Sequence, residues 1–239
     1  MITDSTDIVT TIEDKAGLYR LLSWLSPAYP VGAFSYSHGI EYAVEAGLVR
    51  DRATLTDWIA GILRQGAGVS DGALLAAAWR AARTSDVVAL CDLSALSAAW
   101  RGGSELALES AGQGRAFLAI TRSAWPDPFL DELALAIGEA EIGYPVAFGL
   151  AAGRTGIPLH ATLVGYFQAF AANLVSAAVR LIPLGQTDGQ RCQRALLAEV
   201  LAIADQALAA DPAEAGTAAP MVDWTSMRHE TQYTRLFRS

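Results

Sequence analysis

Apolar residues recur at helical spacing through most of this chain. In residues 15–25, for example, Leu18, Leu21, Leu22 and Leu25 would lie along one side of a helix, whereas no segment sustains the alternation of a half-buried strand. With proline, glycine and capping residues as helix ends, the pattern predicts roughly ten helices. They span residues 15–25, 36–46, 55–63 (beginning at Thr54 or Thr56), 71–83, 86–99, 103–123, 127–140, 145–154, 158–182 and 187–210.

One predicted helix also has the length of a membrane span, because residues 161–179 carry no charge. One side of this helix is small or polar, with Thr162, Gly165, Ala169, Asn173, Ser176 and Arg180 at helical spacing. The other side is bulky, with Leu163, Phe167, Phe170, Leu174 and Leu181. Small residues let another helix approach closely in a soluble core as readily as in lipid. We therefore expect a buried central helix and not a transmembrane one.

Composition supports a folded helical protein. Hydrophobic residues make up 52% of the 239 residues and charged residues 18%, which excludes a disordered chain. Alanine is common and β-branched residues are sparse, a balance that favours helices. We expect one all-α domain, a helical bundle, over residues 15–210. Residues 1–14 are polar and acidic without the features of a signal peptide, which predicts a flexible N-terminus and a cytoplasmic protein.

Charge and cysteine content narrow the partners and cofactors. The chain has 17 basic and 25 acidic residues, a net charge of −8, and no run of Lys or Arg, so we expect no nucleic-acid partner. Cys91 and Cys192 are far apart and lie in no CxxC pattern. This argues against a structural zinc site and a secretory disulfide framework.

The character of the chain changes at Asp211. Residues 211–220 contain Pro, Gly, Thr and Ala without periodicity, which predicts a flexible linker. The tail that follows carries Trp224, Tyr233, Leu236 and Phe237 among arginines, a composition enriched at protein–protein interfaces. We predict that residues 211–239 form a linker and a flexible partner-binding tail. Docking of this tail on its own domain is equally compatible with the sequence.

Catalytic motifs are absent from the sequence. It contains no GxxxxGK[ST], GxSxG or HExxH, so we expect no nucleotide hydrolysis and no catalytic residues. His38 and Glu41 have a spacing that could offer two metal ligands, but a capping or surface interaction is the commoner role. The carboxylate pairs Glu105/Glu109 and Glu139/Glu141 are interpreted as solvated helix faces.

Three motifs carry a resemblance to a known family. They are SPAYPVGAFSYSHGIE at residues 26–41, RLIPLGQTDGQR at 180–191 and HETQYTRLFRS at 229–239. In these motifs prolines fix φ, glycines permit close approach, and aromatic rings supply rigid contact area. In order and spacing the motifs resemble the UreF family of urease accessory proteins over residues 18–239. His38 departs from the family pattern, which more often has Gln there.

The resemblance implies an all-α homodimer without catalytic activity that helps to load nickel into urease. The implied partners are UreD (UreH in some organisms), the GTPase UreG and the apo-urease subunits. Nickel and GTP would act in that complex, and the chain would have no cofactor or metal of its own. The alternatives are a helical adaptor unrelated to urease and an all-α enzyme with an unrecognised site. By resemblance, the partner interface would comprise Pro27, Pro30, Gly32, Phe34, Ser35, Tyr36, Gly39, Glu41, Pro183, Leu184, Gly185, Gln186, Gln190, His229, Glu230, Arg235, Leu236, Phe237 and Arg238.

Overall fold

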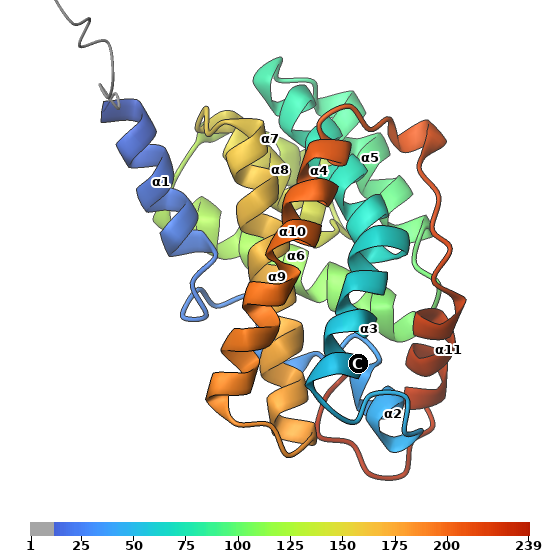
Figure 1. Cartoon of the computed structure of the whole chain (residues 1–239). Helices are drawn as coiled ribbons and strands as arrows, with labels where there is room; N and C mark the ends of the chain where they lie inside the picture. The colour runs from blue at the N-terminus through green and yellow to red at the C-terminus, as the bar shows by residue number, and fades with distance from the viewer. Residues whose placement is uncertain (1–11) are drawn as a thin grey trace, which may run out of the picture.

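The computed structural model describes the chain from Ile12 to Ser239, and within this range every regular element is helical (Figure 1). Eleven α-helices and two short 3-10 helices form a single all-α domain, which confirms the predicted fold class. The elements are α1 (Ile12–Trp24), η1 (Ala33–Ser35), α2 (Ile40–Glu45), α3 (Arg52–Gln65), α4 (Ala67–Arg83), α5 (Val87–Ala99), α6 (Ser104–Ala124), α7 (Pro128–Ile137), α8 (Tyr144–Arg154), α9 (Leu159–Leu181), α10 (Gln186–Ala207), η2 (Pro212–Glu214) and α11 (Pro220–His229).

Most predicted helices are found within a few residues of their expected ends. A flexible N-terminus was predicted over residues 1–14. Residues 1–11 lie outside the described residues, and α1 begins at Ile12. The helix predicted for 36–46 begins only at Ile40, because His38 and Gly39 both have left-handed backbone conformations (φ 55° and 76°). A right-handed helix cannot pass through two such residues.

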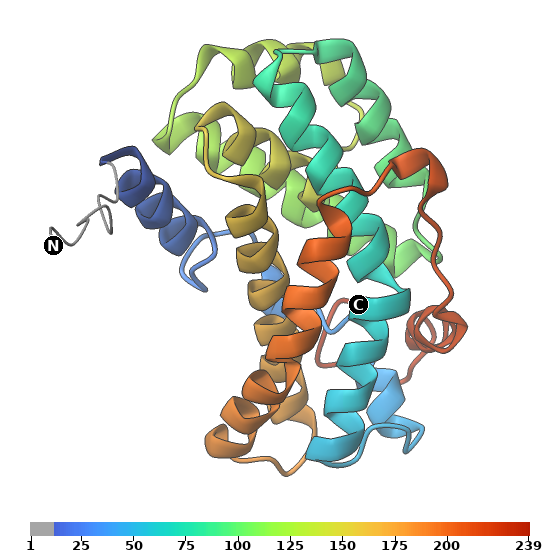
Figure 2. The ribbon, with the colours of Figure 1, turned by 45° about the horizontal axis from the view of Figure 1, so that its top comes forward.

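Small residues explain how the helices pack so closely. Helix α4 lies in the middle of the bundle and packs most extensively on α8, with further contacts to α5, α3, α10 and α9 (Figure 2). Gly149 and Gly153 of α8 face Ala78 and Ala82 of α4. Without larger side chains between them, the two backbones come into direct contact, which is why this Ala- and Gly-rich sequence forms a dense core.

Helix α9 is long and apolar enough to cross a membrane by composition, but here it packs on α10, α2, α4 and α3. On its bulky side Leu163, Phe167 and Leu174 are fully buried, whereas Phe170 and Leu181 are half-buried. The small-residue side differs from the expectation. It is largely half-exposed, and Gly165 faces the side chain of Leu25 directly after α1, with Leu21 of α1 farther away.

The C-terminal residues are packed on the domain, which is the alternative that the sequence left open beside a flexible tail. Residues 211–219 follow the surface, where the Ala218 N–H donates to the Gln65 carbonyl. Helix α11 then packs on α2 and α6 (Figure 1). We call residues 230–239 the terminal segment; it lies beside η1 and α2, and Phe237 and Ser239 are buried. Its polar groups have buried partners on α2 and α6.

Candidate functional site

The terminal segment is bound through its backbone to the first motif. The Arg238 N–H donates to the Ser35 carbonyl (2.8 Å), and the Ser37 N–H donates to the Ser239 carbonyl (2.8 Å). The Glu41 carboxylate accepts hydrogen bonds from the backbone N–H groups of Leu236 (2.6 Å) and Phe237 (2.9 Å). Hydrogen bonds to an ionised group are the stronger ones in proteins. They hold the segment in a defined position.

A cluster of buried charged groups anchors the start of the terminal segment. The imidazole of His229 is fully buried, with Nδ1 2.6 Å from Glu105 Oε2 and Nε2 2.9 Å from Glu41 Oε2. The Arg235 guanidinium donates to the other Glu105 oxygen (2.8 Å). We call His229, Glu41, Glu105 and Arg235 the anchor cluster. It joins α11, α2, α6 and the terminal segment.

Glu109, one turn after Glu105 on α6, continues this row of buried carboxylates. It accepts from the Ser239 hydroxyl (2.9 Å) and from the Gln113 amide (3.5 Å), and His38 Nδ1 lies 3.4 Å from it. The interpretation of Glu105 and Glu109 as a solvated pair is therefore wrong. The docked terminal segment covers them and supplies the hydrogen bonds that water would otherwise make.

His38 and Glu41 do not act as a pair of metal ligands in this structure. His38 turns its ring toward Glu109 and packs edge-on against Phe170, whereas Glu41 binds the terminal segment. No group of three or more His, Cys, Asp or Glu side chains suited to a metal ion occurs among the described residues.

Gly39 is required at its position, because a side chain there would meet the backbone of Ser226 in α11.

Arg180, at the end of α9, links the second motif to the other two. Its guanidinium lies between the rings of Phe34 (3.7 Å to the centroid) and Phe237 (4.2 Å), and it donates to the Phe34 carbonyl (2.9 Å). Burial lowers the pKa of Arg180, although a guanidinium stays charged at physiological pH. Stacking on two rings adds cation–π stabilisation to the docked segment.

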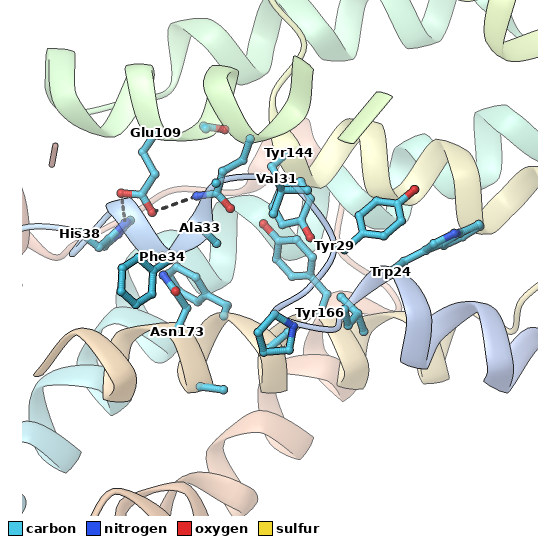
Figure 3. A pocket seen from close by; sticks show the side chains of 18 of the residues that line it. Trp24, Tyr29, Val31, Ala33, Phe34, His38, Glu109, Tyr144, Tyr166 and Asn173 are labelled. Atoms are coloured by element: carbon cyan, nitrogen blue, oxygen red, sulfur yellow. Dashed lines mark hydrogen bonds and ion pairs between the residues drawn. The ribbon is translucent and has the colours of Figure 1, made fainter. Parts of the chain in front are cut away.

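A cavity of about 580 Å³ opens beside this site, between the loop after α1, α6 and α9 (Figure 3). Tyr29, Tyr144 and Tyr166 form an aromatic wall, and His38 and Glu109 lie at one end. Deeper in, Asp71 pairs with Arg101 (2.9 Å) and accepts from the Tyr166 hydroxyl (2.7 Å).

Two tyrosines and one aspartate of the cavity are held in unreactive states. Burial, and then the charge of Asp71, raise the pKa of Tyr166 well above its usual value. Burial likewise raises the pKa of Tyr144. Both phenols stay protonated at neutral pH, and Asp71 is engaged by its two partners, so these groups form no activated nucleophile or base.

The structure brings the first and third motifs together but adds only Arg180 from the second. Gln186 and Gln190 lie on the exposed start of α10, and among the described residues they form no hydrogen bond with the other motifs. Of the predicted interface residues, these are exposed: Pro27, Pro30, Gly32, Phe34, Pro183, Gly185, Gln186, Gln190, Glu230, Arg235, Leu236 and Arg238. Ser35 and Leu184 are half-exposed, and Tyr36, Gly39, Glu41, His229 and Phe237 are buried.

The buried members cannot contact a partner in this conformation, so they would act by positioning the exposed ones. Sequence reasoning missed Glu105 and Glu109 as members of the site. Their partners His229 and Ser239 are 124 and 130 residues away. No local pattern indicates such a pairing.

Proteins that share one name are similar to this chain over nearly its whole length. A family model described as UreF matches residues 49–197. The protein named urease accessory protein UreF from Granulibacter bethesdensis is 57% identical over 230 residues, covering 96% of this chain and 97% of the relative. Proteins of the same name from Rhodopseudomonas palustris (strain HaA2) and Bradyrhizobium diazoefficiens are 50% and 48% identical, with 95% of this chain and 95% and 93% of the relatives covered.

Proposed function

The chain belongs to the UreF family of urease accessory proteins, and we propose that it is the scaffold that joins UreD to the GTPase UreG during maturation of apo-urease. Its relatives are named as accessory proteins and not as enzymes. In this proposal nickel is the cargo of the complex, UreG binds the GTP and this chain regulates the GTPase. The complex forms in the cytoplasm.

The observation that supports this proposal is the surface formed around the docked terminal segment. Tyr233 is fully exposed, Leu236 and Phe34 are 62% and 67% exposed, and Met221, Trp224 and Met227 project from α11. Aromatic residues, methionine and arginine are enriched at interfaces. Because the anchor cluster and Arg180 already hold this surface in place, a partner loses less free energy to ordering when it binds. We propose that UreD binds here.

The test is co-purification with UreD and UreG after a single exposed substitution. Leu236→Arg places a charge in the proposed interface and should abolish co-purification with UreD while leaving the melting temperature unchanged. The matched control is Leu135→Arg, because Leu135 is 83% exposed and its helix, α7, lies at the opposite end of the molecule from α2 and α11 (Figure 1). If Leu236→Arg still binds UreD, the surface is wrongly assigned. If the unmodified chain binds neither UreD, UreG nor urease, the adaptor role in urease maturation is wrong.

The homodimer implied by family membership is part of the same proposal. Helix α1 buries Leu21 and Trp24 on one side but leaves Leu18, Tyr19 and Leu22 58–66% exposed on the other. A helix that is apolar on both sides favours a second packing partner, and we propose a second copy of this chain. Sedimentation should show a dimer that Leu22→Arg dissociates and that Leu135→Arg leaves intact. An unchanged dimer in Leu22→Arg would exclude this face.

A further inference from the structure

The anchor cluster contains a histidine whose two ring nitrogens both face carboxylates. Nδ1 of His229 is 2.6 Å from Glu105 and Nε2 is 2.9 Å from Glu41. An ionised carboxylate only accepts hydrogen bonds, and a neutral imidazole carries a single N–H. A neutral ring could therefore donate to only one of the two carboxylates, and its bare nitrogen would face the other.

The charge of the cluster leads to the same protonation state. The charged groups around the ring come from every element that packs on it: Glu41 from α2, Glu105 from α6 and Arg235 from the terminal segment. With a neutral His229 these three leave one uncompensated negative charge in a buried site. Farther along α6, Glu109 faces His38 and the Ser239 hydroxyl, and it supplies no positive charge.

We infer that His229 is held as an imidazolium between Glu41 and Glu105, and that this proton is required for the terminal segment to dock. Removal of the proton breaks one charge-assisted hydrogen bond and leaves one negative charge of the carboxylate pair uncompensated, because Arg235 balances only the other. Glu41 also holds the backbone of Leu236 and Phe237, so repulsion within the cluster acts directly on the segment. Docking is complete when His229 is protonated and weakens as pH rises through its deprotonation. His229 is thus a positioning residue with a titratable role.

The proposal is tested on the isolated chain, without UreD or UreG, so its failure is distinct from failure of the proposed function. Trypsin can cleave after Arg235 only when the segment undocks, because in the docked segment the Leu236 N–H of the scissile bond is bound to Glu41. When the pH is raised from about 6.5 to about 9, cleavage at this bond should accelerate at least tenfold. A synthetic peptide of residues 226–239, digested in parallel, corrects for the pH dependence of trypsin itself.

Two histidine variants show whether the titrating group is His229. His229→Gln should be cleaved fast at every pH, because glutamine cannot supply the charge. His160→Gln is the matched control. His160 also pairs with a carboxylate, Asp205 at 3.0 Å, but it is exposed and remote from the cluster. This variant should keep the wild-type profile.

A spectroscopic measurement keeps the proposal testable even if His229→Gln does not fold. In the ¹⁵N spectrum of the wild-type chain at about pH 7, both ring nitrogens of His229 should carry protons. A ring with one bare nitrogen would overturn the proposal, and so would corrected cleavage that does not change with pH. A bare ring nitrogen would mean that the proton is not held by His229. Cleavage that does not change with pH would mean that docking does not depend on this proton.

Discussion

Adding one methyl group at two different helical glycines should change stability in opposite directions. Gly149 lies in α8 where it meets α4, and a Cβ there would overlap the Leu75 carbonyl oxygen and lie 3.2 Å from the Ala78 Cβ. Gly61 lies inside α3, and a Cβ there would meet nothing within 4 Å. Both Gly→Ala changes gain the same helix propensity, about 1 kcal/mol. Only Gly149→Ala must separate two packed backbones.

The steric cost at Gly149 lies at the upper end of the usual overpacking range, about 3 kcal/mol, because backbone cannot move aside as a side chain can. After the propensity gain, the net loss for Gly149→Ala is about 2 kcal/mol, whereas Gly61→Ala gains about 0.5–1 kcal/mol. For a chain of this length, each kcal/mol shifts the melting temperature by about 2–4 °C. Gly149→Ala should therefore melt about 4–8 °C lower than the wild-type chain and Gly61→Ala about 1–4 °C higher.

The assay is thermal and urea unfolding followed by circular dichroism at the helical band, with the unfolding slope compared between variants. Equal slopes would show that the native state has the same compactness in each. If Gly149→Ala is as stable as the wild type, the α4–α8 contact is not as close as described and the packing argument fails. If Gly61→Ala is destabilised, the open space around Gly61 is wrong.

Three further predictions concern the buried charges, the thiols and the absence of nucleotide chemistry. Asp71→Asn should lower the free energy of unfolding by about 3–5 kcal/mol, because it removes the carboxylate that pairs with the buried Arg101 cation. A urea unfolding midpoint close to that of the wild-type chain would contradict this prediction. Burial raises the pKa of the Cys192 thiol, so less of it is thiolate at a given pH. A thiol reagent at about pH 8 should therefore modify the half-exposed Cys91 first. Equal modification rates of the two cysteines in the native chain would refute the burial of Cys192. The purified chain should not hydrolyse GTP, since it has no phosphate-binding loop; saturable turnover free of UreG would show otherwise.

The long helices could be predicted because they bury apolar side chains at regular spacing. The helix expected over 158–182 is α9 at Leu159–Leu181, and the one expected over 103–123 is α6 at Ser104–Ala124. Helix α11 was not predicted, because its buried face is mostly polar. Val222, Thr225, Ser226 and His229 have helical spacing and are buried, yet a hydropathy pattern registers only the first of them.

The site was predictable only in part, because it depends on pairings between distant charged residues. The motif at residues 26–41 and the aromatic and arginine-rich tail were singled out from their composition, the motif at 229–239 from the resemblance, and the structure places the two motifs in contact. Glu105 and Glu109 are different, since a carboxylate in a helix is solvated unless something covers it. The cover is residues 229–239, and that relationship exists only in the folded chain.

The separation between Glu41 and His229 has a consequence for biosynthesis. They are 188 residues apart, so at ordinary translation rates Glu41 is synthesised roughly 10–40 s before His229. During that interval Glu41, Glu105 and Glu109 have none of their C-terminal partners and must stay hydrated. The corner of the bundle around α2 and α6 therefore closes last, after the α4–α8 core can already have formed. A nascent chain caught before that point presents a row of acidic side chains to any protein that meets it.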